Sequence, residues 1–379
     1  MFVLKIIFDY RAYLWPLRAF YEHDLYTHQI SLSFVINNKI NSFKDMEIVN
    51  DSVELIIEEG LKKIELIGKV CTKKEHNITE NSYINFIRSR IKEGHTSIFA
   101  HEFVYFDVSV VNRDFINSII KSNRYIRISD DNYYIAVSYR SLIDMMFYDY
   151  SDTLLKDIVI RFWELTPELC YIFNLTPRYG DGTTNRYLHI NRVDSDYILK
   201  RCPEIYAVTF KFTTNRAIAN EIIRHSEIAP MQESTRWINY NKSNGGNIEF
   251  INPFDCIDIC DSIDIEEIIE FGEETFADNN ILSEQTYKDL IKGGISHQVA
   301  RDILPLNLKT ELYMTGTIRM WLGSDNTYTI GDLTFRILKG FIPQRTAKSA
   351  HPQIRELANK VNKLLKVNYS KYYDFKSGI

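Results

Sequence analysis

Regular hydrophobic patterning begins near residue 46 and predicts one strand followed by two helices. Residues 46–56 (MEIVNDSVELI) read as a strand, and residues 58–70 (EEGLKKIELIGKV) place apolar side chains at the three-to-four spacing of a helix. Residues 80–94 (ENSYINFIRSRIKEG) repeat that spacing, with Gly94 as the expected C-terminal stop. His95 is therefore predicted to lie directly after a helix end, which is a common place for ligand contacts.

Two later segments alternate apolar and polar residues, and we predict that both are strands of one sheet: residues 102–110 (EFVYFDVSV) and 205–212 (IYAVTFKF). The stretch between them, residues 111–204, is rich in tyrosine and has patterns of its own, so we interpret it as an inserted subdomain. Residues 1–45 are aromatic and poorly patterned, and we treat them as an N-terminal extension. The patterns inside the insertion are two helical segments and a Gly/Asn-containing loop, at residues 140–150, 154–165 and 178–187.

The C-terminal part is predicted to be mainly helical. The acidic stretch 255–278 reads as a solvated face without a function. Two short helices are expected at residues 283–294 and 296–304, and a further helix from Asn307 through the segment KTELYMTGTIRMW. Lys309, within that segment, is expected to make a structural ion pair.

Composition excludes several classes of protein. No apolar run approaches the ~18–20 residues of a membrane span, so a soluble, cytoplasmic protein is expected. The net charge of −5 argues against a dedicated binder of duplex nucleic acid, which would carry a basic excess. The five cysteines are scattered, which is typical of reduced thiols. Cys256 and Cys260 lack a second Cys or His pair, so no metal site is predicted.

One segment concentrates cationic and hydroxyl side chains where a helix gives way to a loop. Residues 221–237 read EIIRHSEIAPMQESTRW, which gathers Arg224, His225, Ser234 and Arg236 around this junction. Arginine side chains and free backbone N–H groups can converge there on an anion, and phosphate is the natural ligand. The alternative is that the two arginines only form surface ion pairs with neighbouring glutamates.

The spacing within this segment resembles the signature of the flavin-dependent thymidylate synthase (ThyX) family. That signature is RHR, seven residues, a serine, and then an arginine and an aromatic residue. Here RHS is followed after seven residues by Ser234, and then by Arg236 and Trp237. Three further segments resemble the family in the same order along the chain: residues 65–101, 300–321 and 345–361.

The resemblance implies an α+β fold over residues 46–110 and 205–379, with a largely antiparallel central sheet flanked by helices. It implies methylation of dUMP to dTMP, with FAD as the cofactor and with NADPH and methylenetetrahydrofolate as co-substrates. It also implies a homotetramer whose active sites lie between subunits. Separated residues such as Arg224 and Arg301 could then come from different chains.

By motif position, the resemblance also implies roles for individual residues. The flavin would be contacted by His95, Ser97, His225 and Arg319. Arg345 would lie near the uracil and stabilise charge that develops on the ring, which makes it the predicted catalytic residue. The residues implied to hold dUMP are Arg224, Gln232, Glu233, Ser234, Arg236, Arg301 and Arg345.

The chain departs from the family pattern at several places, Ala100 and Met231 among them. Ser226 stands where the signature has its second arginine, and Thr317 stands where members often carry asparagine. Residues 322–340 interrupt what resembles one continuous helix leading to Arg345, an interruption that could displace Arg345 from the site. These departures favour two alternatives: a related flavin- and folate-dependent (hydroxy)methyl transfer to a pyrimidine nucleotide, or a catalytically silent binding protein.

Overall fold

The structure is a computed structural model that describes residues 46–109, 111–148, 153–176, 189–256, 265–330 and 333–370. The expected extension at residues 1–45, the loop at 178–187 and Cys260 lie outside these residues. Within the described part of the chain, no helix is long and apolar enough to cross a membrane.

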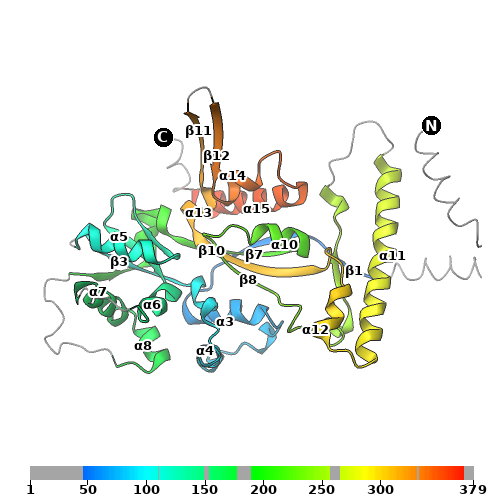
Figure 1. Ribbon diagram of the computed structural model, residues 1–379, viewed down its shortest axis with the longest axis horizontal. Helices are drawn as coiled ribbons and strands as arrows, with labels where there is room; N and C mark the ends of the chain where they lie inside the picture. The colour runs from blue at the N-terminus through cyan, green and yellow to red at the C-terminus, as the bar shows by residue number, and fades with distance from the viewer. Residues whose placement is uncertain are drawn as a thin grey trace, which may run out of the picture.

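A four-stranded antiparallel sheet forms the centre of the molecule (Figure 1). Its two longest strands pair along their whole length, from Lys309 opposite Asn215 to Thr317 opposite Ala207. Together with the helices on both of its faces, this sheet confirms the predicted α+β class. In spatial order, the strands are β2 (Ser52–Ile56), β7 (Ala207–Asn215), β10 (Lys309–Thr317) and β8 (Ala229–Gln232).

One face of this sheet is apolar and carries a compact core. Phe210, Phe212 and Met314 lie on that face and are fully buried against Trp321 and Phe341. Alternate residues of a strand point to the same face, so these even-numbered positions read as one hydrophobic surface. The helices over this face are α10 (Arg216–Ile222), α13 (Ile318–Leu322), α14 (Phe341–Arg345) and α15 (Pro352–Asn368).

The opposite face is covered in part by the two helices predicted near the start of the patterned region. Both predictions are confirmed, because α3 (Gly60–Val70) and α4 (Ser82–Lys92) end where the sequence indicates. Gly94 follows α4 with a φ of 75°, a left-handed conformation that suits glycine after a helix. The 3₁₀ helices are η2 (Glu75–Asn77), η3 (Thr96–His101), η4 (Pro203–Ile205), η5 (Ser243–Gly246), η6 (Phe254–Cys256) and η7 (Arg301–Ile303).

The insertion builds most of a second four-stranded sheet, in the order β4 (Ile126–Ile128), β5 (Tyr134–Ser138), β3 (Phe103–Asp107) and β6 (Asn191–Val193). Because β3 pairs with β5 and β6 and not with β7, the prediction that residues 102–110 and 205–212 share a sheet is wrong. Alternation predicts a strand, but long-range packing selects its partner. The helices here are α5 (Arg113–Ser122), α6 (Tyr139–Met145), α7 (Thr153–Glu164), α8 (Pro167–Phe173) and α9 (Ser195–Arg201).

Residues 46–56 form two strands where one was predicted. The ladder is interrupted at Asn50 and Asp51, so that β2 joins the central sheet while β1 (Glu47–Val49) pairs in parallel with β9 (Glu249–Ile251). The two strands therefore belong to different sheets. The alternation of apolar and polar residues does not indicate that the chain changes from one partner strand to another.

Two helix predictions in the C-terminal part also need correction. Residues 283–292 are the end of the 28-residue helix α11 (Ile265–Lys292), not a separate short helix, and α12 (His297–Ala300) follows the Gly293–Gly294 break. Residues 309–317 form strand β10, where a helix was predicted. The strand lies between β7 and β8, so both of its edges are paired, and this tertiary pairing overrides a helix-like spacing of apolar residues.

The segment between α13 and α14 is a hairpin of two antiparallel strands, β11 (Ser324–Ile330) and β12 (Leu333–Lys339) (Figure 1). Its two ends lie next to each other. Gly323 and Gly340 flank it with φ values of 59° and 85°, and a Cβ built on Gly340 would lie only 2.3 Å from the Cα of Gly323. Both positions therefore require glycine. Because the hairpin closes on itself, it does not separate Arg345 from α10.

Candidate functional site

A cavity of about 730 Å³ opens on the α3 face of the central sheet, next to the end of the 221–237 segment. Trp237 and Asn239 form one wall, and the loop after α3 forms another. Basic and acidic side chains both line the cavity, the acidic ones being Glu75, Glu249 and Glu311. Its basic side chains are Lys73, Lys74, His76, Lys211, Lys242 and Lys309.

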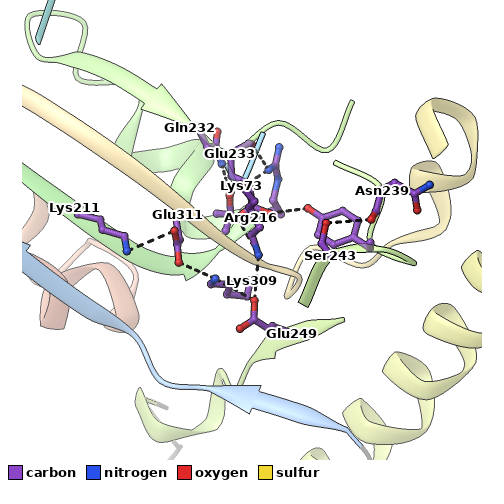
Figure 2. A network of polar contacts seen from close by, with 12 residues as sticks. Lys73, Lys211, Arg216, Gln232, Glu233, Asn239, Ser243, Glu249, Lys309 and Glu311 are labelled. Carbon is purple, nitrogen blue, oxygen red and sulfur yellow. Dashed lines mark hydrogen bonds and ion pairs between the residues drawn. The ribbon is translucent and has the colours of Figure 1, made fainter. Parts of the chain in front are cut away.

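Alternating lysines and glutamates line the sheet side of this cavity (Figure 2). Lys309 Nζ lies 2.8 Å from Glu311 Oε1 and 3.0 Å from Glu249 Oε2, which also receives Lys73 Nζ at 3.1 Å. Lys211 Nζ lies 3.5 Å from Glu311 Oε2. Burial lowers the pKa of Lys309, but the glutamates outweigh burial and raise it above its ordinary value. The prediction that Lys309 makes a structural ion pair is confirmed.

Glu249 and Glu311, the two glutamates of this network, are ionised. Burial raises the pKa of Glu249 and of Glu311, but the lysines lower both values by more, so each pKa lies below its ordinary range. Each of these charges therefore has a partner of opposite sign within the protein, and the ion pairs tie β7, β9 and β10 together.

Glu233 connects this network to the 221–237 segment from inside the protein. Its side chain is fully buried, accepts a 2.9 Å hydrogen bond from the Tyr240 hydroxyl, and lies 3.7 Å from Lys73 Nζ. Burial raises the pKa of the Glu233 carboxyl, and Lys73 opposes that rise. Arg216 at the start of α10 donates to the Glu233 carbonyl oxygen at 3.0 Å. These contacts order the backbone of residues 232–237.

The polar residues on either side of Glu233 are held by backbone and side-chain contacts. Gln232 Nε2 donates to Thr310 Oγ1 at 3.2 Å, and the Ser234 N–H donates to the Cys71 carbonyl oxygen at 3.2 Å. Strand β10 and the end of α3 therefore fix the position of this loop.

Two arginines implied to hold dUMP lie beside the same loop. Arg301 donates from its NH1 group to Thr235 Oγ1 at 3.2 Å. Arg236 is exposed, and its guanidinium lies over the Trp237 ring, 5.5 Å from the ring centroid. An exposed guanidinium held by an aromatic ring is ready to meet an anion without losing a buried partner. The structure thus gathers Gln232, Glu233, Ser234, Arg236 and Arg301 in one place.

Arg345 belongs to a second group, at the C-terminal end of α10. Its Nε donates to His225 Nε2 at 2.8 Å, its NH1 group to Glu221 Oε2 at 3.1 Å, and its NH2 group to the Glu221 carbonyl oxygen at 2.7 Å. Burial and the charge of Arg345 lower the pKa of His225 to about 4, so His225 is a neutral acceptor at pH 7. Arg224 is exposed beside this group and lowers the pKa of Arg345, after the larger effect of burial.

The remaining residues implied to contact flavin lie on other elements. His95 and Ser97 are exposed after the end of α4, where His95 Nε2 lies 3.7 Å from Glu93. Arg319 on α13 forms an ion pair with Asp130. After the larger effect of burial, Arg319 also lowers the pKa of Arg127, whose guanidinium lies 3.8 Å from Glu227 on the turn after His225. No hydrogen bond or ion pair among the described residues joins His95 or Ser97 to His225 or Arg319.

The departures from the family pattern lie in different surroundings. Ser226 is exposed on the turn after α10. Thr317 is fully buried at the N-cap of α13, directly before the helix that carries Arg319. Neither residue adds a cation. Among the described residues, no group of three or more His, Cys, Asp or Glu side chains could hold a metal ion.

Sequence reasoning did not single out Lys73, Arg216 and Tyr240 as supports of the site. Each is far from Glu233 along the chain or carries no motif of its own, so only the folded contacts identify it. The sequence offers only an indirect indication of these partners. A glutamate within QESTRW, if buried, needs polar or cationic side chains around it.

Comparison with known proteins supports the expected family. Residues 197–324 match the sequence model of the Thy1 family, described as thymidylate synthase complementing protein. A flavin-dependent thymidylate synthase of Synechocystis sp. is 31% identical over 122 residues, which is 31% of this chain and 55% of that relative. The chain thus spans about half the length of the curated relative that it matches. The resemblance inferred from the sequence is confirmed.

Proposed function

We propose that this chain, whose residues 197–324 belong to the Thy1 family, is a flavin-dependent thymidylate synthase that methylates dUMP to dTMP. Methylenetetrahydrofolate would supply the carbon unit and NADPH the reducing equivalents, with FAD as the bound cofactor. The observation that carries the proposal is the matched segment itself. It contains Arg224 and Arg236 of the 221–237 segment and extends to Arg301 and Arg319.

The loop of residues 232–237 is suited to hold the phosphate of the nucleotide. Arg301 bonds to Thr235, Arg236 lies over the Trp237 ring, and the contacts of buried Glu233 already order the loop backbone. A dianionic phosphate gains from several charge-assisted hydrogen bonds, and an ordered loop loses little conformational entropy on binding.

Arg345 is the group we assign to the uracil ring. Neutral His225 and the Glu221 carboxylate hold its guanidinium in one orientation, so it would meet the developing negative charge on the ring without reorganising. Arg224 would add a further donor from the exposed side of the same helix end.

By family resemblance, FAD would be held by groups from more than one copy of the chain, and no described contact joins His95 or Ser97 to His225 or Arg319. FAD, when bound, would supply the hydride chemistry that completes the methyl group. We therefore propose a homo-oligomer, a tetramer by family resemblance, in which the two arginine groups of neighbouring copies face each other.

The test is a spectrum followed by product analysis. The purified protein, incubated with FAD and desalted, is expected to retain absorbance near 450 nm and, with NADPH, methylenetetrahydrofolate and dUMP, to form dTMP detected by mass. The matched control is Arg345→Gln, which removes the guanidinium from the proposed uracil site. A flavin-bound protein that makes hydroxymethyl-dUMP would support the related transfer reaction, which Ser226 favours. A protein that retains neither FAD nor dUMP would refute both enzymatic functions.

A further inference from the structure

A separate cleft lies where the insertion meets the central sheet. It has a volume of about 340 Å³ and continues into a second cavity of about 400 Å³, since Glu59, Glu102 and Arg192 line both. One side is formed by the end of β2 and the start of β7, and the other by β3 and the residues after β6. None of the residues assigned to dUMP or FAD lines this cleft.

The two cations of the 340 Å³ cleft, Lys63 and Arg192, are already paired with carboxylates, and exposed Lys62 lines only the second cavity. Lys63 Nζ lies 3.3 Å from Glu102 Oε2, and Arg192 NH2 lies 2.9 Å from Glu168 Oε1. Glu59 has no cationic partner among the described residues, and it is the N-cap residue of α3 without accepting a hydrogen bond from that helix. The cleft therefore keeps an excess of negative charge, to which Glu58 and Asp194 also contribute.

Three tyrosines form the aromatic part of the same cleft. The rings of Tyr105 and Tyr206 are parallel, with centroids 6.2 Å apart, and Tyr206 also contacts Tyr369 at 5.9 Å. Tyr105 is 5% exposed; its hydroxyl accepts from the Ala207 N–H at 2.9 Å, and its own hydrogen has no acceptor among the described residues. Burial raises the pKa of Tyr206 and of Tyr369, and the charge of Glu59 adds to both rises.

These features discriminate between classes of ligand. An anion in the 340 Å³ cleft would face Glu58 and Glu59, and both cations that line this cleft are already paired. A metal ion would need converging ligands, and the described residues contain no such group. A protonated amine satisfies both parts of the cleft, because its charge pairs with a carboxylate and its carbon chain packs on aromatic faces.

We propose that this cleft binds a small organic cation, a protonated amine, between the Glu59 carboxylate and the rings of Tyr206 and Tyr369. The site is independent of thymidylate synthesis. The insertion supplies β6 and Arg192 to the side of the cleft opposite the end of β2. Occupancy would join the start of α3 to the start of β7 and the end of α15, so binding stabilises the folded chain.

Spermidine serves as the probe, titrated into the full-length protein by calorimetry at low salt. We expect one spermidine per chain, with an affinity that falls as NaCl is raised. Glu59→Gln keeps the shape of the side chain and removes its charge, and it should weaken binding at least tenfold. Tyr206→Leu should weaken binding about threefold to tenfold through loss of the ring face.

The matched control is Glu80→Gln, which removes one exposed carboxylate outside the cleft and should leave the affinity unchanged. Retention of the wild-type melting temperature by Glu59→Gln in the absence of spermidine establishes that this variant is folded. Equal affinity of Glu59→Gln and Glu80→Gln, or the absence of saturable binding to the wild type, would overturn the proposal.

Discussion

The two polar groups on the central sheet differ in how their charges are satisfied. In the network of Lys309, Glu311 and Glu249, every charge is paired within the protein, and Lys309 has a side chain that is only 7% exposed. The group around Arg345 is closer to solvent, and its partners are a neutral imidazole and one carboxylate on the edge of α10.

This difference indicates that the Lys309 network stabilises the fold, whereas the Arg345 group is available for catalysis. A buried network in which every charge is paired cannot release a cation to a ligand without leaving a buried anion unpaired, so it serves to hold strands in place. Arg345 is held by a neutral imidazole and by the partly exposed Glu221 carboxylate, so its orientation is fixed while its charge is less fully compensated. Residues of the first kind should therefore control stability, and residues of the second kind should control turnover.

The largest expected effect concerns the buried network. Lys309→Met removes the cation between Glu249 and Glu311, and it should lower the free energy of unfolding by about 3–5 kcal/mol. Lys211→Met is the matched control at the more exposed end of the same network, with an expected loss below about 1 kcal/mol. Urea denaturation followed by circular dichroism measures both. Equal losses for the two variants would contradict the distinction.

The next effect is on turnover. Arg345→Gln should reduce kcat for dTMP formation by about 10²–10³-fold, equivalent to roughly 2.7–4 kcal/mol of transition-state stabilisation, with little change in unfolding free energy. Lys348→Gln removes an exposed cation three residues further on and should leave kcat unchanged. A variant at Arg345 that unfolds easily but turns over normally when folded would assign this residue to stability.

His225 should have a smaller effect, on the pH dependence of the free energy of unfolding. Its pKa in the folded chain, about 4, is below the ordinary value of 6.5, so the unfolded chain binds a proton first as the pH falls. The stabilising effect of neutral His225 is complete above pH 6.5 and is lost between pH 6.5 and 4, by about 2 kcal/mol after allowance for partial exposure.

His225→Gln keeps an acceptor for Arg345 but does not titrate, so its stability should fall less than that of the wild type over the same pH range. Chemical denaturation at pH 7, 5.5 and 4.5 provides the comparison. Buried His101, whose pKa is lowered to about 3 chiefly by burial, is present in both proteins and cancels in the difference. Parallel pH profiles would mean that His225 is already protonated beside Arg345.

The smallest effect should come from the hairpin. Deletion of residues 324–339, which joins Gly323 directly to Gly340, should change the unfolding free energy by no more than about 1 kcal/mol, because the two glycines already touch. Thermal unfolding measures the change. If kcat for dTMP also stays the same, the hairpin is separate from the Arg345 group. A collapse of stability would show that the hairpin supports α13 and α14.

Much of the fold followed from local pattern. The helices α3, α4, α6 and α7 were predicted because each has an apolar stripe at helical spacing with a recognisable end. Strand β10 was missed, because its apolar positions also fit a helix and its pairing on both edges is a long-range property. The partner of β3 was missed for the same reason.

The sequence by itself determined the family resemblance and the chemistry available to the site. The spacing from Arg224 to Trp237 is a local property, and it supplies guanidinium and hydroxyl groups wherever the segment lies. Only the tertiary structure decided that Glu233 points inward, that Arg301 joins the 232–237 loop, and that Arg345 on α14 bonds to the end of α10 instead. The physical reason is that a buried charge must find partners, and those partners are chosen by strand pairing and helix packing across hundreds of residues.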